Sequence, residues 1–106
     1  MKKKITQLCR VIRSKNSGPY ELTIDLIFNE QLDYLKVKEG SLINKEMIAN
    51  LYKISVDDVI VLVFFDAALA IKATIKRPLV AGAIGETDVY GAQQHAPLLQ
   101  IELDMI

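Results

Sequence analysis

Two segments of the chain alternate apolar and polar side chains, which is the pattern of a strand with one buried face. YELTIDLIF at residues 20–28 alternates throughout, and AIKATIK at residues 70–76 does the same. VIVLVFF at residues 59–65 is apolar at every position and predicts a central strand buried on both faces. A last strand is predicted near the C-terminus, with three inward positions: Leu99, Ile101 and Leu103.

Helical spacing is found near the N-terminus. Four apolar residues there are spaced i, i+3, i+4 and i+7 and predict an amphipathic helix: Ile5, Leu8, Cys9 and Ile12. The motif SKNSGP at residues 14–19 is expected to end this helix. A strand over residues 7–13 stays open as an alternative.

Capping residues indicate further helical segments in the middle of the chain. Asn29 is placed to cap a short helix that carries Leu32 and Leu35. Asn44 is placed to cap another helix. SVDD at residues 55–58 resembles a capping box and predicts a single helical turn.

These elements predict one α+β domain over residues 1–106, with two or three helices on one face of a mainly antiparallel sheet of about four strands. A ferredoxin-like arrangement is the simplest candidate for that layout. Residues 78–97 hold no helical or strand period. Loops of this length inside a compact domain are usually functional or disordered.

Charge and composition exclude several classes of function. Lys plus Arg and Asp plus Glu number 13 each, so the chain lacks the positive excess that nucleic-acid binding uses. The longest apolar stretch, residues 59–71, contains Asp66 and is too short to span a bilayer, so no membrane role is expected. Apolar residues make up 51% of this small chain, which favours a homo- or hetero-oligomer.

The single cysteine, Cys9, allows neither an intrachain disulfide nor a cysteine-based metal site. This is the pattern of a cytoplasmic protein. One histidine with an Asp or two falls short of a metal-ligand set, and we expect neither a metal nor a cofactor.

Three polar stretches are candidates for chemistry. In RSKNSGPY at residues 13–20, Arg13, Lys15 and Asn16 lie beside a turn and could hold a carboxylate or phosphate. In FFDAALAIKATIKRP at residues 64–78, Asp66 follows an apolar strand and Lys72 lies on the polar face of the next one. The simpler interpretations are a helix stop, a turn residue and a solvated strand face.

The third stretch is TDVYGAQQHAPLLQ, at residues 87–100. His95 could act as a general acid or base near neutral pH, although no nucleophile accompanies it. The residues around it are a hydroxyl, two amides and one acid, which suit binding better than bond-making. They are Tyr90, Gln93, Gln94 and Asp88. The alternative is that these residues fix a long loop to the sheet through hydrogen bonds.

Taken together, VIRSKNSGPYELTIDLIF, VFFDAALAIKATIKRP and TDVYGAQQHAPL resemble a family of small proteins that accompanies AtuA-type proteins, named for acyclic terpene utilisation. Members occur as a separate chain or as a C-terminal domain of the larger protein. The resemblance covers nearly the whole chain, with the three stretches in the same order. It implies a ferredoxin-like fold and partnership with an AtuA-type protein, and it carries no established activity.

If the three stretches converge, they form a mixed polar pocket for a small organic acid or acyl group. The expected ligand-binding residues are Arg13, Lys15, Asn16, Asp66, Lys72, Arg77, Asp88, Tyr90, Gln93 and Gln94. We therefore expect an accessory subunit that completes a ligand site with an AtuA-type partner. Two alternatives stay open: a free-standing enzyme that uses His95 as acid or base, and a structural oligomerisation domain.

Overall fold

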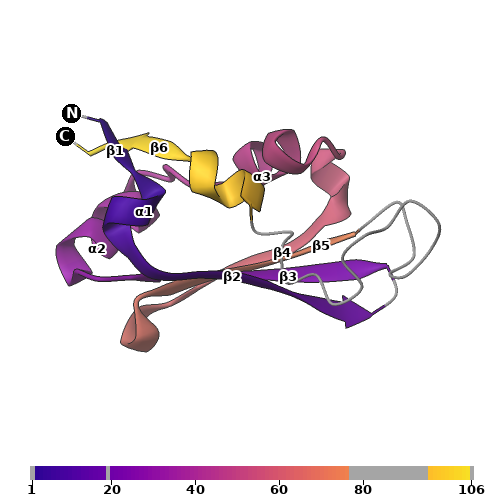
Figure 1. Cartoon of the computed structure of the whole chain (residues 1–106), viewed down its shortest axis with the longest axis horizontal. Helices are drawn as coiled ribbons and strands as arrows, with labels where there is room; N and C mark the ends of the chain where they lie inside the picture. Colours follow the sequence, from indigo (N-terminus) through magenta and orange to yellow (C-terminus); the bar gives the residue numbers. More distant parts are fainter. Residues whose placement is uncertain (1, 19, 77–95, 106) are drawn as a thin grey trace.

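The computed structural model describes residues 2–18, 20–76 and 96–105. Four strands form the main sheet in the order β2 (Cys9–Gly18), β3 (Glu21–Phe28), β5 (Ala70–Lys76) and β4 (Val59–Phe65), and every neighbouring pair is antiparallel. A short ribbon of β1 (Lys2–Lys4) and β6 (Glu102–Asp104) brings the two ends of the chain together (Figure 1).

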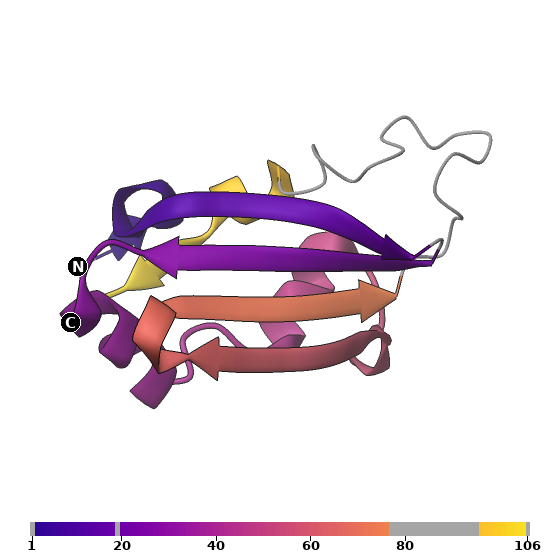
Figure 2. The same cartoon turned by 90° about the horizontal axis from the view of Figure 1, so that it is seen from below.

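Three α-helices lie on one side of this sheet (Figure 1). They are α1 (Ile5–Leu8), α2 (Gln31–Glu39) and α3 (Lys45–Tyr52). Short 3-10 turns complete the described part: η1 (Val56–Asp58), η2 (Asp66–Ala68) and η3 (Ala96–Gln100). The opposite face of the sheet is covered by no described element (Figure 2).

The core lies between the sheet and the helices. Alternate residues of β3 and β5 point into it and are at most 2% exposed: Leu22, Ile24, Leu26, Phe28, Ile71, Ala73 and Ile75. From the other side, α1, α2 and α3 contribute Leu8, Tyr34 and Ile48, each at most 1% exposed. The alternation in residues 20–28 and 70–76 is therefore confirmed as two strands with one buried face each.

The α+β class with a four-stranded antiparallel sheet is confirmed, but the ferredoxin-like topology is not. A ferredoxin-like chain runs β-α-β-β-α-β. Here β2 and β3 follow each other directly, and α2 and α3 come together between β3 and β4. The described residues contain no parallel neighbours in the sheet.

The predicted N-terminal helix is wrong beyond its first turn. The helix α1 ends at Leu8, and Cys9 begins the ten-residue strand β2. SKNSG at residues 14–18 belongs to this strand and does not stop a helix. The strand that stayed open as an alternative for residues 7–13 is observed from Cys9 onward. Pairing with β3 decides between the two, because an eight-residue helix is marginal while a strand gains a ladder of hydrogen bonds, here with a register shift between Cys9 and Val11.

The prediction that residues 59–65 form a strand is confirmed, but the central position is wrong. Among the described strands, β4 is the last of the sheet and has a neighbour, β5, on one side only. Ile60, Val61 and Phe65 are 42%, 40% and 50% exposed. Because the described elements cover only one face of this sheet, an apolar side chain on β4 can lie on the face away from the core.

Two of the predicted caps are confirmed. Oδ1 of Asn44 accepts a hydrogen bond from the backbone N–H of Met47 at 2.9 Å, which begins α3. The Ser55 hydroxyl accepts from Asp57 N at 3.3 Å and begins the single turn η1.

The cap predicted at Asn29 is wrong, because α2 begins after Glu30 without a side-chain cap. Leu32 is 73% exposed, whereas Tyr34 and Val37 are fully buried. Leu35, the other apolar residue assigned to this helix, is partly buried and packs against the core.

The predicted last strand is confirmed only at its end. Leu99 lies in η3 and is 42% exposed, because the chain turns there, with Ile101 N donating to Leu98 O. Leu103 lies in β6 and is 3% exposed. Across residues 2–18, 20–76 and 96–105, no helix has the length and apolar character to cross a bilayer.

Candidate functional site

The open face of the sheet carries a row of three charged residues on three neighbouring strands. Arg13 of β2 lies opposite Asp25 of β3, and Asp25 lies opposite Lys72 of β5. Residues directly opposite each other on antiparallel strands share a face. Asp25 alternates with the buried Ile24 and Leu26, so this row lies on the face away from the core.

A second row lies one step further along the same face. Lys15 of β2 is opposite Thr23 of β3, which is opposite Thr74 of β5. Arg13 and Lys15 therefore point to the same side of β2, two residues apart. Together the two rows contain three cations, Arg13, Lys15 and Lys72, and one carboxylate, Asp25.

Arg13 and Asp25 form an ion pair across the two strands. Nε of Arg13 donates to Oδ2 of Asp25 at 3.0 Å. The Arg13 side chain is 64% exposed and that of Asp25 is 21% exposed. The pair orients the guanidinium along the sheet and leaves much of it open to a further anion.

Two shallow hollows flank Asp25 and Lys72 on this face. A polar hollow of about 470 Å³ is lined by Lys15, Asn16, Ser17, Thr23, Asp25 and Lys72. A smaller hollow of about 180 Å³ is lined by Arg13, Asp25, Ile27, Phe65, Ala68, Ala70 and Lys72. Asp25 and Lys72 stand between a polar and a largely apolar surface, which is the arrangement that an amphipathic ligand needs.

The structure thus brings together four of the residues that the sequence indicated: Arg13, Lys15, Asn16 and Lys72. Asp66 lines neither hollow. Arg77, Asp88, Tyr90, Gln93, Gln94 and His95 lie outside the described residues, so their convergence with this face stays a prediction.

Asp66 instead joins α2 to the turn between β4 and β5. Its Oδ1 accepts from the Tyr34 hydroxyl at 2.6 Å and from Nζ of Lys38 at 2.8 Å. The Lys38 hydrogen bond, followed by that of Tyr34, lowers the pKa of the Asp66 carboxyl. Burial, with a smaller effect of the Asp66 hydrogen bond, raises the pKa of Tyr34 to about 12. This constellation is a structural clamp between a helix and a sheet edge.

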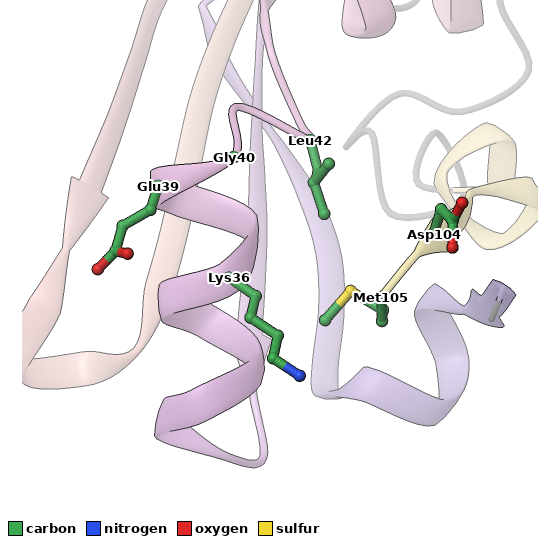
Figure 3. A pocket seen from close by; sticks show the side chains of 6 residues that line it. All are labelled: Lys36, Glu39, Gly40, Leu42, Asp104 and Met105. Atoms are coloured by element: carbon green, nitrogen blue, oxygen red, sulfur yellow. The ribbon is translucent and has the colours of Figure 1, made fainter.

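A third hollow, of about 390 Å³, lies between the end of α2 and β6. It is lined by Lys36, Glu39, Gly40, Leu42, Asp104 and Met105. Figure 3 shows the Glu39 side chain pointing away from Met105, on the far side of α2. Its charged groups do not converge on one point, so it is a weaker candidate than the open face.

Neither a metal site nor an activated thiol is found in the part of the chain that the structure describes. No three His, Cys, Asp or Glu side chains of those residues come together as a metal ion requires. Cys9 is 7% exposed, and burial raises the pKa of its thiol to about 12. A buried neutral thiol is a poor nucleophile.

Comparison with protein families found one match, over residues 5–102, to a family described as a domain of unknown function, DUF4387. The chain belongs to the DUF4387 family. The match includes all four strands of the main sheet, so the open face with Arg13, Asp25 and Lys72 is part of the DUF4387 domain. Comparison with curated proteins and with solved structures gave no match.

Asp25 is the residue of this DUF4387 face that the sequence did not indicate as a site. Alternation in residues 20–28 had placed it on the polar side of a strand, which is typical of any solvated face. Its role depends on the strand order, because only β2 on one side and β5 on the other bring Arg13 and Lys72 to it. A correct register for residues 9–18 would have revealed it.

Proposed function

We propose that this DUF4387 chain is an accessory subunit that docks onto an AtuA-type partner and contributes a binding surface for an organic acid or acyl-type metabolite. The observation that carries the proposal is the row Arg13, Asp25 and Lys72 on the uncovered face of the sheet. The partner comes from the sequence resemblance.

The charges of the open face favour a carboxylate ligand. Three cations, Arg13, Lys15 and Lys72, surround one carboxylate, so one added negative charge is attracted to this site. The guanidinium of Arg13 can bind a ligand carboxylate through donors other than the Nε that Asp25 occupies.

The neighbouring apolar surface favours a ligand with a hydrocarbon part. Ile27, Phe65 and Ala70 line the smaller hollow next to the same Asp25 and Lys72. Phe65 is 50% exposed, so covering it with an acyl chain removes apolar surface from water. The ligand head then lies over the charged row and its chain lies toward β4.

Exposure of this face favours an accessory role over a free-standing enzyme. Both hollows are shallow, and charges in contact with water attract a ligand only weakly. A partner that covers the face excludes water and strengthens the same contacts. The described residues of the row are suited to holding an anion, and bond-making groups would come from the partner.

Co-purification and ligand titration test the two parts of this proposal separately. The tagged chain is co-expressed with an AtuA-type protein, and the complex is titrated calorimetrically with butyrate, with butyramide as the neutral control. Lys72→Gln removes a charge from the row, and Lys45→Gln makes the same change at an exposed position of α3, away from the open face.

We expect wild type and Lys45→Gln to bind butyrate equally and Lys72→Gln to bind it about tenfold more weakly, which corresponds to about 1.4 kcal/mol. Butyramide should bind none of them measurably. Equal binding by Lys72→Gln and Lys45→Gln would contradict the ligand site. Failure of the wild-type chain to co-purify would contradict the partnership.

A further inference from the structure

One edge of the main sheet lacks the charges that normally protect an exposed strand. The edge strand β4, Val59–Phe65, contains no charged residue and no proline. Ile60, Val61 and Phe65 are between 40% and 50% exposed. An edge strand presents unpaired backbone N–H and C=O groups, and a long apolar one pairs readily with another strand.

The opposite edge is protected. The strand β2 carries Arg10, Arg13 and Lys15, and each is exposed. Charged side chains on an edge strand oppose pairing, and two copies of β2 would repel each other. The sheet therefore has one edge that resists a second copy and one that does not.

We propose that β4 pairs antiparallel with β4 of a second copy and makes a two-fold symmetric dimer with one continuous eight-stranded sheet. An uncharged strand is best matched by another uncharged strand, and the second copy supplies one of the same length. A head-to-tail contact of β4 with β2 would place apolar side chains beside the three cations, and it would not close.

Side-chain faces, flanking acids and the irregularity of β4 between Val59 and Val61 select the register of this pairing. Residues that lie opposite each other in the paired strands must point to the same face of the sheet. The two-fold axis therefore passes through one residue of β4 and not between two residues. An axis at Leu62 would place Asp58 opposite Asp66 of the second copy, where two carboxylates repel. An axis at Val63 places Val61 opposite Phe65 of the second copy and separates the acids.

This pairing leaves the charged row of the candidate ligand site away from the interface, while Phe65 of the smaller hollow lies beside it. Arg13, Asp25 and Lys72 lie on β2, β3 and β5, and β5 separates them from the β4 edge. In the continuous sheet both copies present their open faces on the same side. The proposal is independent of the ligand and of the AtuA-type partner.

Size measurements on the purified full chain test the interface. Val63→Lys places two ammonium groups opposite each other at the axis. Leu32→Lys makes the same kind of change at a leucine of α2 that is 73% exposed and lies off the edge. We expect wild type and Leu32→Lys to sediment at about twice 11.9 kDa, and Val63→Lys to sediment as a folded monomer.

Disulfide crosslinking between two copies tests the same interface if Val63→Lys does not fold. Val63→Cys places two thiols opposite each other, within reach of a disulfide under mild oxidation. Crosslinked dimer in Val63→Cys and none in Leu32→Cys supports the proposal. A monomeric wild-type chain, or equal crosslinking of the two variants, would overturn it.

Discussion

Nε of Arg13 on β2 lies 3.0 Å from Oδ2 of Asp25 on β3, and Lys72 of β5 lies on the other side of the same aspartate. The carboxylate is thus flanked by cations on both neighbouring strands. A ligand carboxylate that approaches this row competes with Asp25 for the same positive groups. In the proposed function, Asp25 therefore sets how strongly the open face attracts an anion.

Asp25→Asn should strengthen binding of a small carboxylate. The change removes the competing negative charge and leaves the size of the side chain almost unaltered. We expect butyrate affinity to rise by about fivefold, equivalent to roughly 1 kcal/mol, and stability to change by less than that, because the Arg13 side chain of the ion pair is 64% exposed. Asp57→Asn, at an exposed acid of η1, is the control in the same calorimetric titration. Weaker binding by Asp25→Asn than by the control would contradict this role.

Tyr34→Phe should destabilise the fold by removing one hydrogen bond. The ring stays in edge contact with Phe28 and Phe64, at centroid distances of 6.0 and 6.4 Å, so only the hydroxyl contact to Asp66 is lost. We expect a loss of about 1–2 kcal/mol in urea unfolding, with an unchanged m-value. Tyr20→Phe removes a hydroxyl from a residue that is 52% exposed and should cost close to nothing. Equal effects of the two changes would show that the Tyr34 contact does not stabilise the fold.

Lowering the pH should selectively remove the contribution of the Asp66 carboxylate to the stability of the fold. Its pKa is lowered in the folded chain, first by Lys38 and then by Tyr34. The carboxylate thus contributes stability above its unfolded pKa of about 4, and this is lost as the pH falls through the lower folded value. The stability difference between wild type and Asp66→Asn should be constant near neutral pH and should narrow below about pH 4.

Chemical unfolding at a series of pH values measures this difference. In a Tyr34→Phe background the narrowing should begin at the same pH, because the unfolded pKa sets its onset. It should be smaller and complete at higher pH, because one of the two hydrogen bonds that lower the Asp66 pKa is missing. If the stability difference between wild type and Asp66→Asn stays constant until the chain unfolds in acid, Asp66 is not charged in its contact with Tyr34 and Lys38.

Cys9 should react with thiol reagents only when the chain unfolds. It is 7% exposed, and its pKa of about 12 leaves roughly one thiolate in ten thousand at about pH 8. Labelling with a chromogenic disulfide should be slow in buffer and should follow the urea unfolding curve. In Leu32→Cys, one of the two thiols should react at once. Immediate labelling of the wild-type chain would contradict the burial of Cys9.

The parts of the fold that could be predicted are the strands with one buried face and the helix with a recognisable N-cap. Alternation identified β3 and β5, and Asn44 identified the start of α3. The strand β2 could be given only as an alternative to a helix, because Ile5, Leu8, Cys9 and Ile12 have helical spacing and a register shift between Cys9 and Val11 interrupts the strand alternation. Hydrogen bonding to β3 decides between them, and that pairing is not a local property of the sequence.

The position of β4 could not be predicted for a different reason. A run of seven apolar residues is typical of a strand between two others, yet β5 returns from η2 and occupies the inner place. Charged residues of the site, Arg13 and Lys72, were predictable from residue type alone. Their shared neighbour Asp25 was not, because the site exists only once β2, β3 and β5 are in register.

The central claim is that the open face of the sheet binds the carboxylate ligand. Two-dimensional amide NMR of the ¹⁵N-labelled chain, titrated with butyrate and separately with butyramide, tests this claim most directly. We predict butyrate-dependent shifts that saturate at Arg13, Thr23, Asp25 and Lys72, with none of comparable size for butyramide. Saturating shifts around Lys36 and Met105 alone, or equal shifts with both compounds, would contradict it.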